Sequence, residues 1–226
     1  MLPESYLHFP NPREADPEGL VASGGDLSVP RLLLAYRSGI FPWTVNPVTW
    51  WSPDPRAIFE LNQFIPPRSL EKFMRKKPFR VTFNRAFRQV MEECAKPAPG
   101  RRGAWITPEF IEAYTRLHEQ GHAHSVECWQ GEELVGGVYG VSIGGFFAGE
   151  SMFHRVSNAS KVALSHLIGR LRERGFDLFD IQMITPVTRL LGAIEIPRDD
   201  YLKRLEIAAK KDPRGTSGER IEERGF

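Results

Sequence analysis

The fold is decided by residues 124–182, which read HSVECWQGEELVGGVYGVSIGGFFAGESMFHRVSNASKVALSHLIGRLRERGFDLFDIQ. The first part of this stretch alternates β-branched, aromatic and polar residues between short glycine-containing turns, a pattern typical of antiparallel strands. It predicts strands over 124–129, 134–141 and 146–150. Because the connecting turns are tight, these strands are expected to form a meander.

A long amphipathic helix and a further strand complete this stretch. Asn158 is expected to cap the helix and Gly175 to end it, with leucine and isoleucine recurring on one face in between. Residues 177–182 then have the composition of a strand. A meander followed by a long helix and a strand is close to the element order of the N-acetyltransferase (GNAT) fold. The pattern therefore predicts an α+β protein with a GNAT-like domain.

Charge and proline content divide the 226 residues into four segments. Residues 1–67 hold eleven of the 18 prolines and are expected to form the turn-rich part of a small N-terminal α/β domain. Residues 68–102, with eleven basic and three acidic side chains, are the basic remainder of that domain. Residues 103–210 are expected to be the larger, GNAT-like domain, and residues 211–226 a flexible tail.

Outside the central stretch the pattern predicts six helices and one strand. They are a helix from Pro30 to Gly39, a basic helix over 68–77, a strand over 79–83, a helix capped by Asn84, a helix from Thr107 to about Gln120, a short helix over 187–191 and a final helix over 198–210. Residues 1–67 are thus expected to contain one helix and otherwise turns.

Composition excludes several classes of protein. No run of eighteen apolar residues is available to span a membrane, and the first residues have neither the basic nor the apolar region of a secretory signal. Cys94 and Cys128 are too few for a disulfide framework or a four-thiolate zinc site, so two ordinary thiols in a cytoplasmic protein are expected. The six scattered histidines have no metal-ligand spacing, and no metal is expected.

The common cofactor motifs are missing. An acetyl-CoA enzyme of this fold needs a glycine-rich turn before the long helix, but residues 154–161 contain no glycine. The sequence also lacks a Walker A motif, a dinucleotide fingerprint and a nucleophile elbow. No cofactor is therefore expected.

Polar residues in apolar surroundings are the candidate functional groups. Asp180 and Gln182 are expected on one face of a strand, where burial of the carboxylate favours a functional or networked role over a merely structural one. Glu150 ends an aromatic strand and is either functional or a rim residue. The basic segment 68–102 is either a phosphate-binding surface or a solvated helical face.

Five stretches resemble the leucyl/phenylalanyl-tRNA–protein transferase family. They are EGLVASGGDLSVPRLLLAYRSGIFPW (18–43), WWSPDPRAIF (50–59), LHEQGHAHSVECW (117–129), ELVGGVYGVSIGGFFAGESMFHRVSNASKVAL (133–164) and FDIQ with LGAIEIPRDDYL (179–202). The resemblance implies a small N-terminal domain and a C-terminal domain of the GNAT fold. It also implies a bacterial, cytoplasmic aminoacyltransferase.

Such an enzyme takes Leu or Phe, with Met as a third candidate, from aminoacyl-tRNA. It attaches the amino acid to the α-amino group of proteins that begin with Arg or Lys, which marks them for N-end-rule degradation. An aminoacyl ester is already activated, so this reaction needs no cofactor and no metal. Two alternatives remain: another tRNA-dependent aminoacyltransferase, or a non-catalytic tRNA-binding protein.

The resemblance also implies site residues. Asp180 and Gln182 would be the catalytic pair, with Asp180 orienting or deprotonating the attacking amine and Gln182 holding the ester. Glu150 would supply negative charge for the basic acceptor terminus, and Trp43 and Trp105 would contact the terminal adenosine of the tRNA. The donor side chain would enter an apolar pocket of Val138, Phe147, Met152, Leu167 and Phe179. Charge alone predicts that the acceptor stem is bound by Arg68, Lys72, Arg75, Lys76, Lys77, Arg80 and Arg85.

The sequence departs from the family pattern at three positions near these residues. Val187 and Leu190 stand where the family has a histidine and a serine, and Ala104 stands where it has a threonine. Asp180 and Gln182 are retained, so the activity is still expected. The departures concern the orientation of that pair, and hence rate or donor preference.

Overall fold

The computed structural model describes residues 7–97 and 105–211. Its strands are β1 (Leu20–Ser23), β2 (Phe41–Val45), β3 (Val48–Trp51), β4 (Arg56–Phe59), β5 (Arg80–Phe83), β6 (Ala123–Gln130), β7 (Glu133–Ile143), β8 (Phe146–His154), β9 (Leu178–Asp180) and β10 (Ile194–Ile196). Its α-helices are α1 (Val29–Arg37), α2 (Arg68–Met74), α3 (Phe87–Ala95), α4 (Pro108–Glu119), α5 (Ala159–Glu173), α6 (Pro186–Leu190) and α7 (Arg198–Lys210). Short 3-10 helices span Pro12–Glu14 and Leu61–Gln63.

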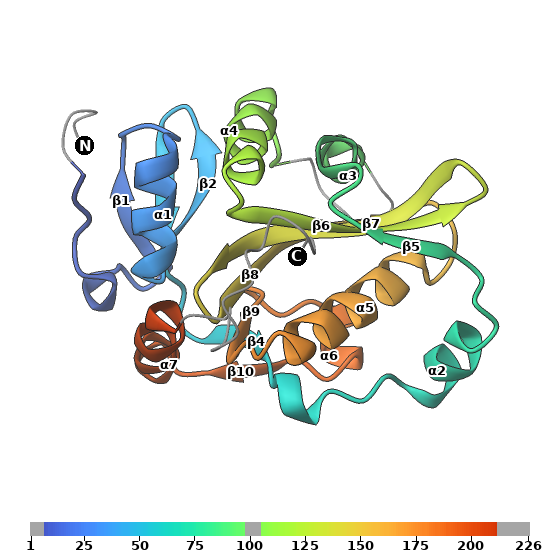
Figure 1. Ribbon diagram of the computed structural model, residues 1–226. Helices are drawn as coiled ribbons and strands as arrows, with labels where there is room; N and C mark the ends of the chain where they lie inside the picture. The colour runs from blue at the N-terminus through green and yellow to red at the C-terminus, as the bar shows by residue number, and fades with distance from the viewer. Residues whose placement is uncertain (1–6, 98–104, 212–226) are drawn as a thin grey trace.

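The strands form two sheets, a small one of order β1-β3-β2 and a seven-stranded one of order β10-β4-β9-β8-β7-β6-β5 (Figure 1). In the large sheet β6, β7 and β8 are an antiparallel meander, and β9 lies parallel to β8 after the crossover helix α5. Helix α5 packs on one face of the meander, and α3 and α4 pack on the other (Figure 1). This arrangement confirms the predicted α+β class and the GNAT-like order of its elements.

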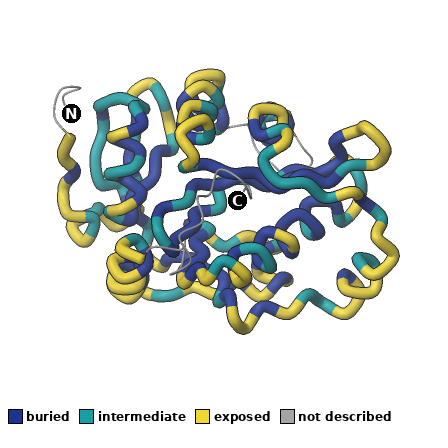
Figure 2. Tube along the Cα trace, in the orientation of Figure 1, coloured by how far each residue is buried: buried dark blue, intermediate teal, exposed yellow. Residues whose placement is uncertain are grey.

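Two apolar clusters sandwich the large sheet. Phe146 and Phe147 are neighbours on β8 but belong to different clusters, because successive residues of a strand face opposite sides. The cluster of Phe146 also takes in α1, α3, α4 and the small sheet, including Trp50. The cluster of Phe147 lies against α5, including Leu167. Figure 2 shows the central strands as the most continuously buried part of the chain.

The N-terminal segment contains more regular structure than its prolines suggest. The predicted helix is present as α1, but the strands β1, β2, β3 and β4 were not foreseen. Pro42 lies in β2, which is an edge strand and does not need every N–H for pairing, and Pro47 lies in the turn between β2 and β3. Prolines at turns and edges are therefore compatible with a small sheet.

The boundaries of the four predicted segments do not coincide with the boundaries between the two sheets. Strand β4 lies before residue 67 and β5 lies in the basic segment 68–102, yet both belong to the large sheet. The four-segment division therefore stays a prediction. Residues 98–104, with Arg101, Arg102 and Ala104, and the predicted tail beyond Lys211 lie outside the described residues.

Two predicted helix caps differ from the structure. Helix α3 begins at Phe87, so Asn84 does not cap it; instead the Asn84 Oδ1 accepts from the backbone N–H of Ser125 over 3.0 Å. Asn84 thereby ties the end of β5 to β6. Asn158 does occupy the position before α5, but with φ of 69° and without a side-chain capping bond. Gly175, with φ of 69°, follows α5 as expected.

The remaining helices match the sequence pattern closely, including α2, α4, α6 and the final helix α7. Among the described residues, no helix combines the length and the apolar character needed to cross a bilayer.

Gly136 offers a test of how closely α5 approaches the sheet. A Cβ at this position would lie 2.5 Å from the Ala159 Cβ and 2.9 Å from the Ala159 carbonyl carbon. Because backbone cannot yield, Gly136→Ala is expected to lower the free energy of unfolding by about 1–3 kcal/mol. The matched control is Gly169→Ala within α5, where nothing lies within 4 Å; it should raise stability by about 0.5–1 kcal/mol. Urea unfolding measures both, and equal effects would contradict the close approach.

Candidate active site

Strand β9 ends at Asp180, and the chain turns directly after it. Gln182 has φ of 56°, in the left-handed region, and its backbone N–H donates to Asp180 Oδ1 over 2.9 Å. An aspartate that accepts from the backbone two residues later stabilises such a turn. The strand predicted over 177–182 is present as β9, but it ends at Asp180. The prediction that Asp180 and Gln182 share one strand face is wrong, because Gln182 lies in the turn beyond the strand end.

Asp180 is surrounded by buried donors. Arg56 donates from Nε to Oδ1 over 2.9 Å and from Nη2 to Oδ2 over 2.7 Å. The Tyr201 hydroxyl donates to Oδ2 over 3.0 Å. With the Gln182 N–H, these contacts fill the four acceptor positions of a carboxylate. Asp180 is 0% exposed, so it has neither spare acceptor capacity nor access to a substrate.

Arg56 is also fully engaged. Its Nη1 donates to the Gly39 carbonyl over 3.0 Å, and the guanidinium lies over the rings of Tyr201 and Phe41. Burial acts to lower the pKa of Arg56, but the Asp180 carboxylate outweighs burial and raises it, so Arg56 stays charged. Removing one partner of a buried ion pair costs about 3–5 kcal/mol, because the other charge is left without compensation.

Glu150, on β8, lies beside Gln182, whose Nε2 donates to Glu150 Oε1 over 3.0 Å. Tyr36 of α1 hydrogen-bonds to the same carboxyl group, and the Tyr36 hydroxyl also bonds to that of Tyr114 on α4. Burial raises the pKa of Glu150 to about 8; the charge of Asp180 acts in the same direction, and the bonds from Tyr36 and Gln182 act against it. The pKa of Glu150 therefore lies well above that of an ordinary glutamate.

A cavity of about 240 Å³ opens beside these groups. Its lining is Phe41, Pro42, Trp43, Trp105, Glu150, Ile181, Gln182, Met183 and Thr185. The predicted residues Trp43, Trp105, Glu150 and Gln182 therefore share one cavity, although they come from four separate parts of the chain. Asp180 is not part of the lining.

The five residues predicted for a donor pocket lie together in one apolar cluster. Val138, Phe147, Leu167 and Phe179 are at most 3% exposed, and Met152 is partly buried against them. None of the five lines the cavity, but Ile181 both lines it and packs on this cluster. Ile181 is thus the link between the cavity and the apolar cluster.

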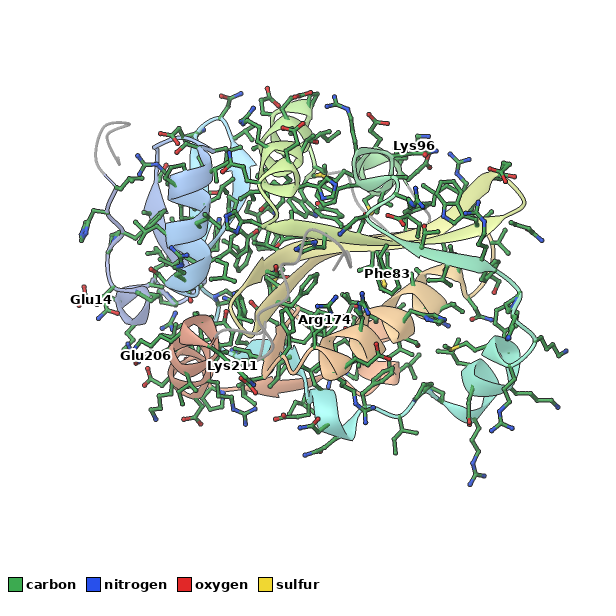
Figure 3. All side chains as sticks on the ribbon, in the orientation of Figure 1. Glu14, Phe83, Lys96, Arg174, Glu206 and Lys211 are labelled. Carbon is green, nitrogen blue, oxygen red and sulfur yellow. The ribbon has the colours of Figure 1, made fainter. Side chains whose placement is uncertain are left out.

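The seven predicted tRNA-contacting cations, here called the basic cluster, lie on and around α2 and β5: Arg68, Lys72, Arg75, Lys76, Lys77, Arg80 and Arg85. All seven are exposed, and Figure 3 shows the side chains of α2 extending away from the body of the protein. Arg75 pairs with Glu71 at 2.6 Å and Arg80 with Glu132 at 3.8 Å. Within residues 7–97 and 105–211, the other five have no carboxylate at ion-pair distance.

The structure adds four site residues that sequence patterns did not single out. They are Arg56, Tyr201, Tyr36 and Tyr114. Arg56 carried a usable signal, because a charged residue at the start of the apolar run Arg56–Phe59 needs a buried partner. The tyrosines carried none, since each is an ordinary apolar residue of its helix in sequence.

Two of the three departures from the family pattern, Val187 and Leu190, lie on α6. Leu190 is 77% exposed, and Val187 packs on the apolar cluster beside α5. Thr188 lies between them and forms a reciprocal capping box with Thr185, which also lines the cavity. In the described part of the chain, no group of three or more His, Cys, Asp or Glu side chains is arranged to hold a metal ion.

The raised pKa of Glu150 predicts a pH-dependent stability. The folded protein keeps the Glu150 proton up to about pH 8, whereas the unfolded chain releases it near the ordinary value of 4.5. Stability should therefore fall as pH rises between these values and level off above them. Glu150→Gln lacks this proton, so its stability relative to wild type should increase from pH 5 to pH 8. Urea unfolding at several pH values measures the difference; a constant difference would contradict the raised pKa.

Comparisons with known proteins agree with the resemblance noted in the sequence. A family model described as leucyl/phenylalanyl-tRNA protein transferase matches residues 58–206, and the model of its N-terminal domain matches residues 25–54. A protein of Pseudoalteromonas atlantica named leucyl/phenylalanyl-tRNA–protein transferase is 52% identical over 211 residues, 92% of this chain and 90% of its own length. A protein of the same name from Nitratidesulfovibrio vulgaris is 49% identical over 217 residues, 95% of this chain and 93% of its own.

Among solved structures, that of L-PGS from Bacillus licheniformis aligns with a TM-score of 0.41 and 14% identity, over 69% of this chain and 50% of that chain. The family model of residues 58–206 covers well over half of the chain. The full-length relatives are named as transferases, and one of them is 52% identical. The chain therefore belongs to the leucyl/phenylalanyl-tRNA–protein transferase family.

Proposed function

We propose that this protein transfers Leu or Phe from aminoacyl-tRNA to the α-amino group of proteins that begin with Arg or Lys. The product carries a new peptide bond and a new N-terminal residue, which marks it for N-end-rule degradation in the cytoplasm. The observation that carries the proposal is the cavity of a member of this family, in which Trp43, Trp105, Glu150 and Gln182 meet. These groups suit a nucleoside, an ester and a basic amino terminus.

Trp43 and Trp105 are suited to hold the terminal adenosine of the tRNA. Each indole is partly buried, lines the cavity and contacts another aromatic ring. The centroid of Trp43 lies 5.5 Å from that of Trp51, and the centroid of Trp105 lies 5.3 Å from that of Phe110. Rigid aromatic faces of this kind stack on bases at about 1–3 kcal/mol per base.

Gln182 is the residue best placed to act on the ester. Its side chain lines the cavity, and its left-handed backbone is held by the Asp180 carboxylate. Asp180 is therefore a positioning residue that acts through Gln182, rather than a group that touches the amine. Arg56 and Tyr201 extend this support, because they hold the Asp180 carboxylate in place. Preorganised donors of this kind stabilise charge that develops on a carbonyl oxygen.

We expect the side chain of the donor amino acid to bind in the apolar cluster next to Ile181. Val138, Phe147, Leu167 and Phe179 would surround a Leu or Phe side chain that enters past Ile181, after local rearrangement of Met152. An apolar site excludes charged amino acids because their desolvation is costly, and it separates similar apolar ones only modestly. Recognition of more than one apolar amino acid is consistent with such a site.

The transfer reaction itself is the first test. Purified protein with labelled Leu-tRNA and an Arg-starting peptide should yield labelled peptide without ATP or added metal. Gln182→Ala should lower turnover by about 10²–10³-fold, while affinity for charged tRNA is kept, because one preorganised amide is lost. The exposed Gln89→Ala on α3 is the matched control and should keep full turnover.

Other results of the transfer assay would support one of the two alternative functions. Transfer to a peptidoglycan-type peptide but not to the Arg-starting peptide would identify another tRNA-dependent aminoacyltransferase. Binding of tRNA with no transfer to any acceptor would leave a tRNA-binding protein without catalytic activity.

The basic cluster predicts the salt dependence of tRNA binding. Each neutralised phosphate contributes about 0.7–0.9 to the slope of log affinity against log salt concentration. Lys72→Ala combined with Lys76→Ala should therefore reduce that slope by about 1.5. Lys203→Ala on α7, an exposed lysine outside the cluster, is the control and should leave the slope unchanged. Filter binding of charged tRNA at several salt concentrations measures it; equal slopes would exclude the cluster as a phosphate contact.

A further inference from the structure

The transfer reaction needs a group that removes a proton from the attacking amine, and Asp180 is unsuited to that role. All four of its acceptor positions are occupied, and it is 0% exposed. Among the described residues that line the cavity, Glu150 is the one with a titratable side chain. The others carry indole, amide, thioether, hydroxyl or purely apolar groups.

Glu150 is also held in a defined position at the cavity wall. Gln182 donates to it over 3.0 Å, and Tyr36 bonds to it from α1. The other charged or titratable groups that act on it are Tyr114 of α4, Arg56 of β4 and Asp180 of β9. Because Gln182 touches both the ester and Glu150 in the proposed function, the carboxylate lies next to the reacting atoms.

We propose that Glu150 is the catalytic residue that transfers the proton in this reaction, an inference that rests on the proposed function. The same carboxylate attracts the basic amino terminus of the acceptor and then acts as its base. Asp180, Arg56 and Tyr201 are not part of the cavity lining and keep a separate role, since they position Gln182.

The proposed step is balanced without any further reactant. The neutral α-amine attacks the ester carbonyl carbon, and a C–N bond forms while the amine proton passes to the Glu150 carboxylate. The bond from this carbon to the ribose oxygen then breaks, and its electron pair stays on that oxygen. Glu150 returns the proton to the ribose oxygen, which leaves as a hydroxyl group, and the carboxylate is restored.

The acidity of Glu150 suits this exchange. Burial raises its pKa to about 8, so the acid form predominates at neutral pH and the carboxylate form becomes populated as the pH rises toward 8. Proton transfer is most efficient when the pKa of the catalytic group lies close to the working pH. The pKa of Glu150 is also close to that of the acceptor α-amine, whose ordinary pKa is about 8.

Glu150→Gln tests the proposal, because glutamine keeps the shape but cannot take up the proton. Single-turnover transfer at saturating acceptor peptide should fall by about 10²–10⁴-fold, with tRNA affinity unchanged. Glu119→Gln, an exposed glutamate on α4, should retain full transfer. If Glu150→Gln raised only the KM for the Arg-starting peptide and left kcat unchanged, Glu150 would recognise the acceptor without acting as a base.

Glu150→Ala with added formate is the second test. Formate fits the space left by the side chain and can accept a proton, so kcat should rise with formate concentration, while formamide of similar size should not raise it. Rescue by both or by neither, in a variant that still binds charged tRNA, would overturn the proposal. The wild-type protein separates this result from a failure of the proposed function: if wild type transfers no Leu, the function itself is wrong.

Discussion

The buried ion pair between Arg56 and Asp180 is the interaction on which the rest of the site depends. It joins β4 to β9 in the large sheet, and Arg56 also reaches the carbonyl of Gly39, just after α1. Tyr201 of α7 completes the same network. Burying two charges is favourable only when their geometry and hydrogen bonding are nearly complete. The pair and its hydrogen bonds therefore hold four segments together: β4, β9, the chain just after α1, and α7. Their arrangement also holds the turn at Gln182 in place.

The cavity lies where the small sheet meets the large one. Strand β2 contributes Trp43, and the large sheet contributes Glu150 and the turn with Gln182. Neither sheet supplies the whole lining, so the site exists only when the two are packed together. A single apolar cluster runs from the small sheet through α1 and α4 to the large sheet, which provides that packing. The cavity lining is therefore complete only while the small sheet stays packed against the large sheet.

Much of the fold could be predicted, because its signals are local. The meander, α5 and α7 follow from periodicity, turn residues and helix ends, all of which act over a few residues. The small sheet was missed because β1 and β3 have only four residues each and lie among prolines. Asn84 was assigned to a helix cap for the same local reason, although its partner Ser125 is 41 residues away.

For the candidate site, sequence alone determined which chemical groups stand out: Asp180 and Gln182 in a predicted strand, and Glu150 at the end of an aromatic strand. The family resemblance added Trp43 and Trp105. The sequence also determined the family, since several long motifs are unbroken. Only the tertiary structure decided which groups face the cavity. It buried Asp180 against Arg56, brought Glu150 into contact with Gln182 and Tyr36, and placed Trp43 and Trp105 in the lining of one cavity. Burial and pKa depend on neighbours that are distant in the chain, and such neighbours have no local signature.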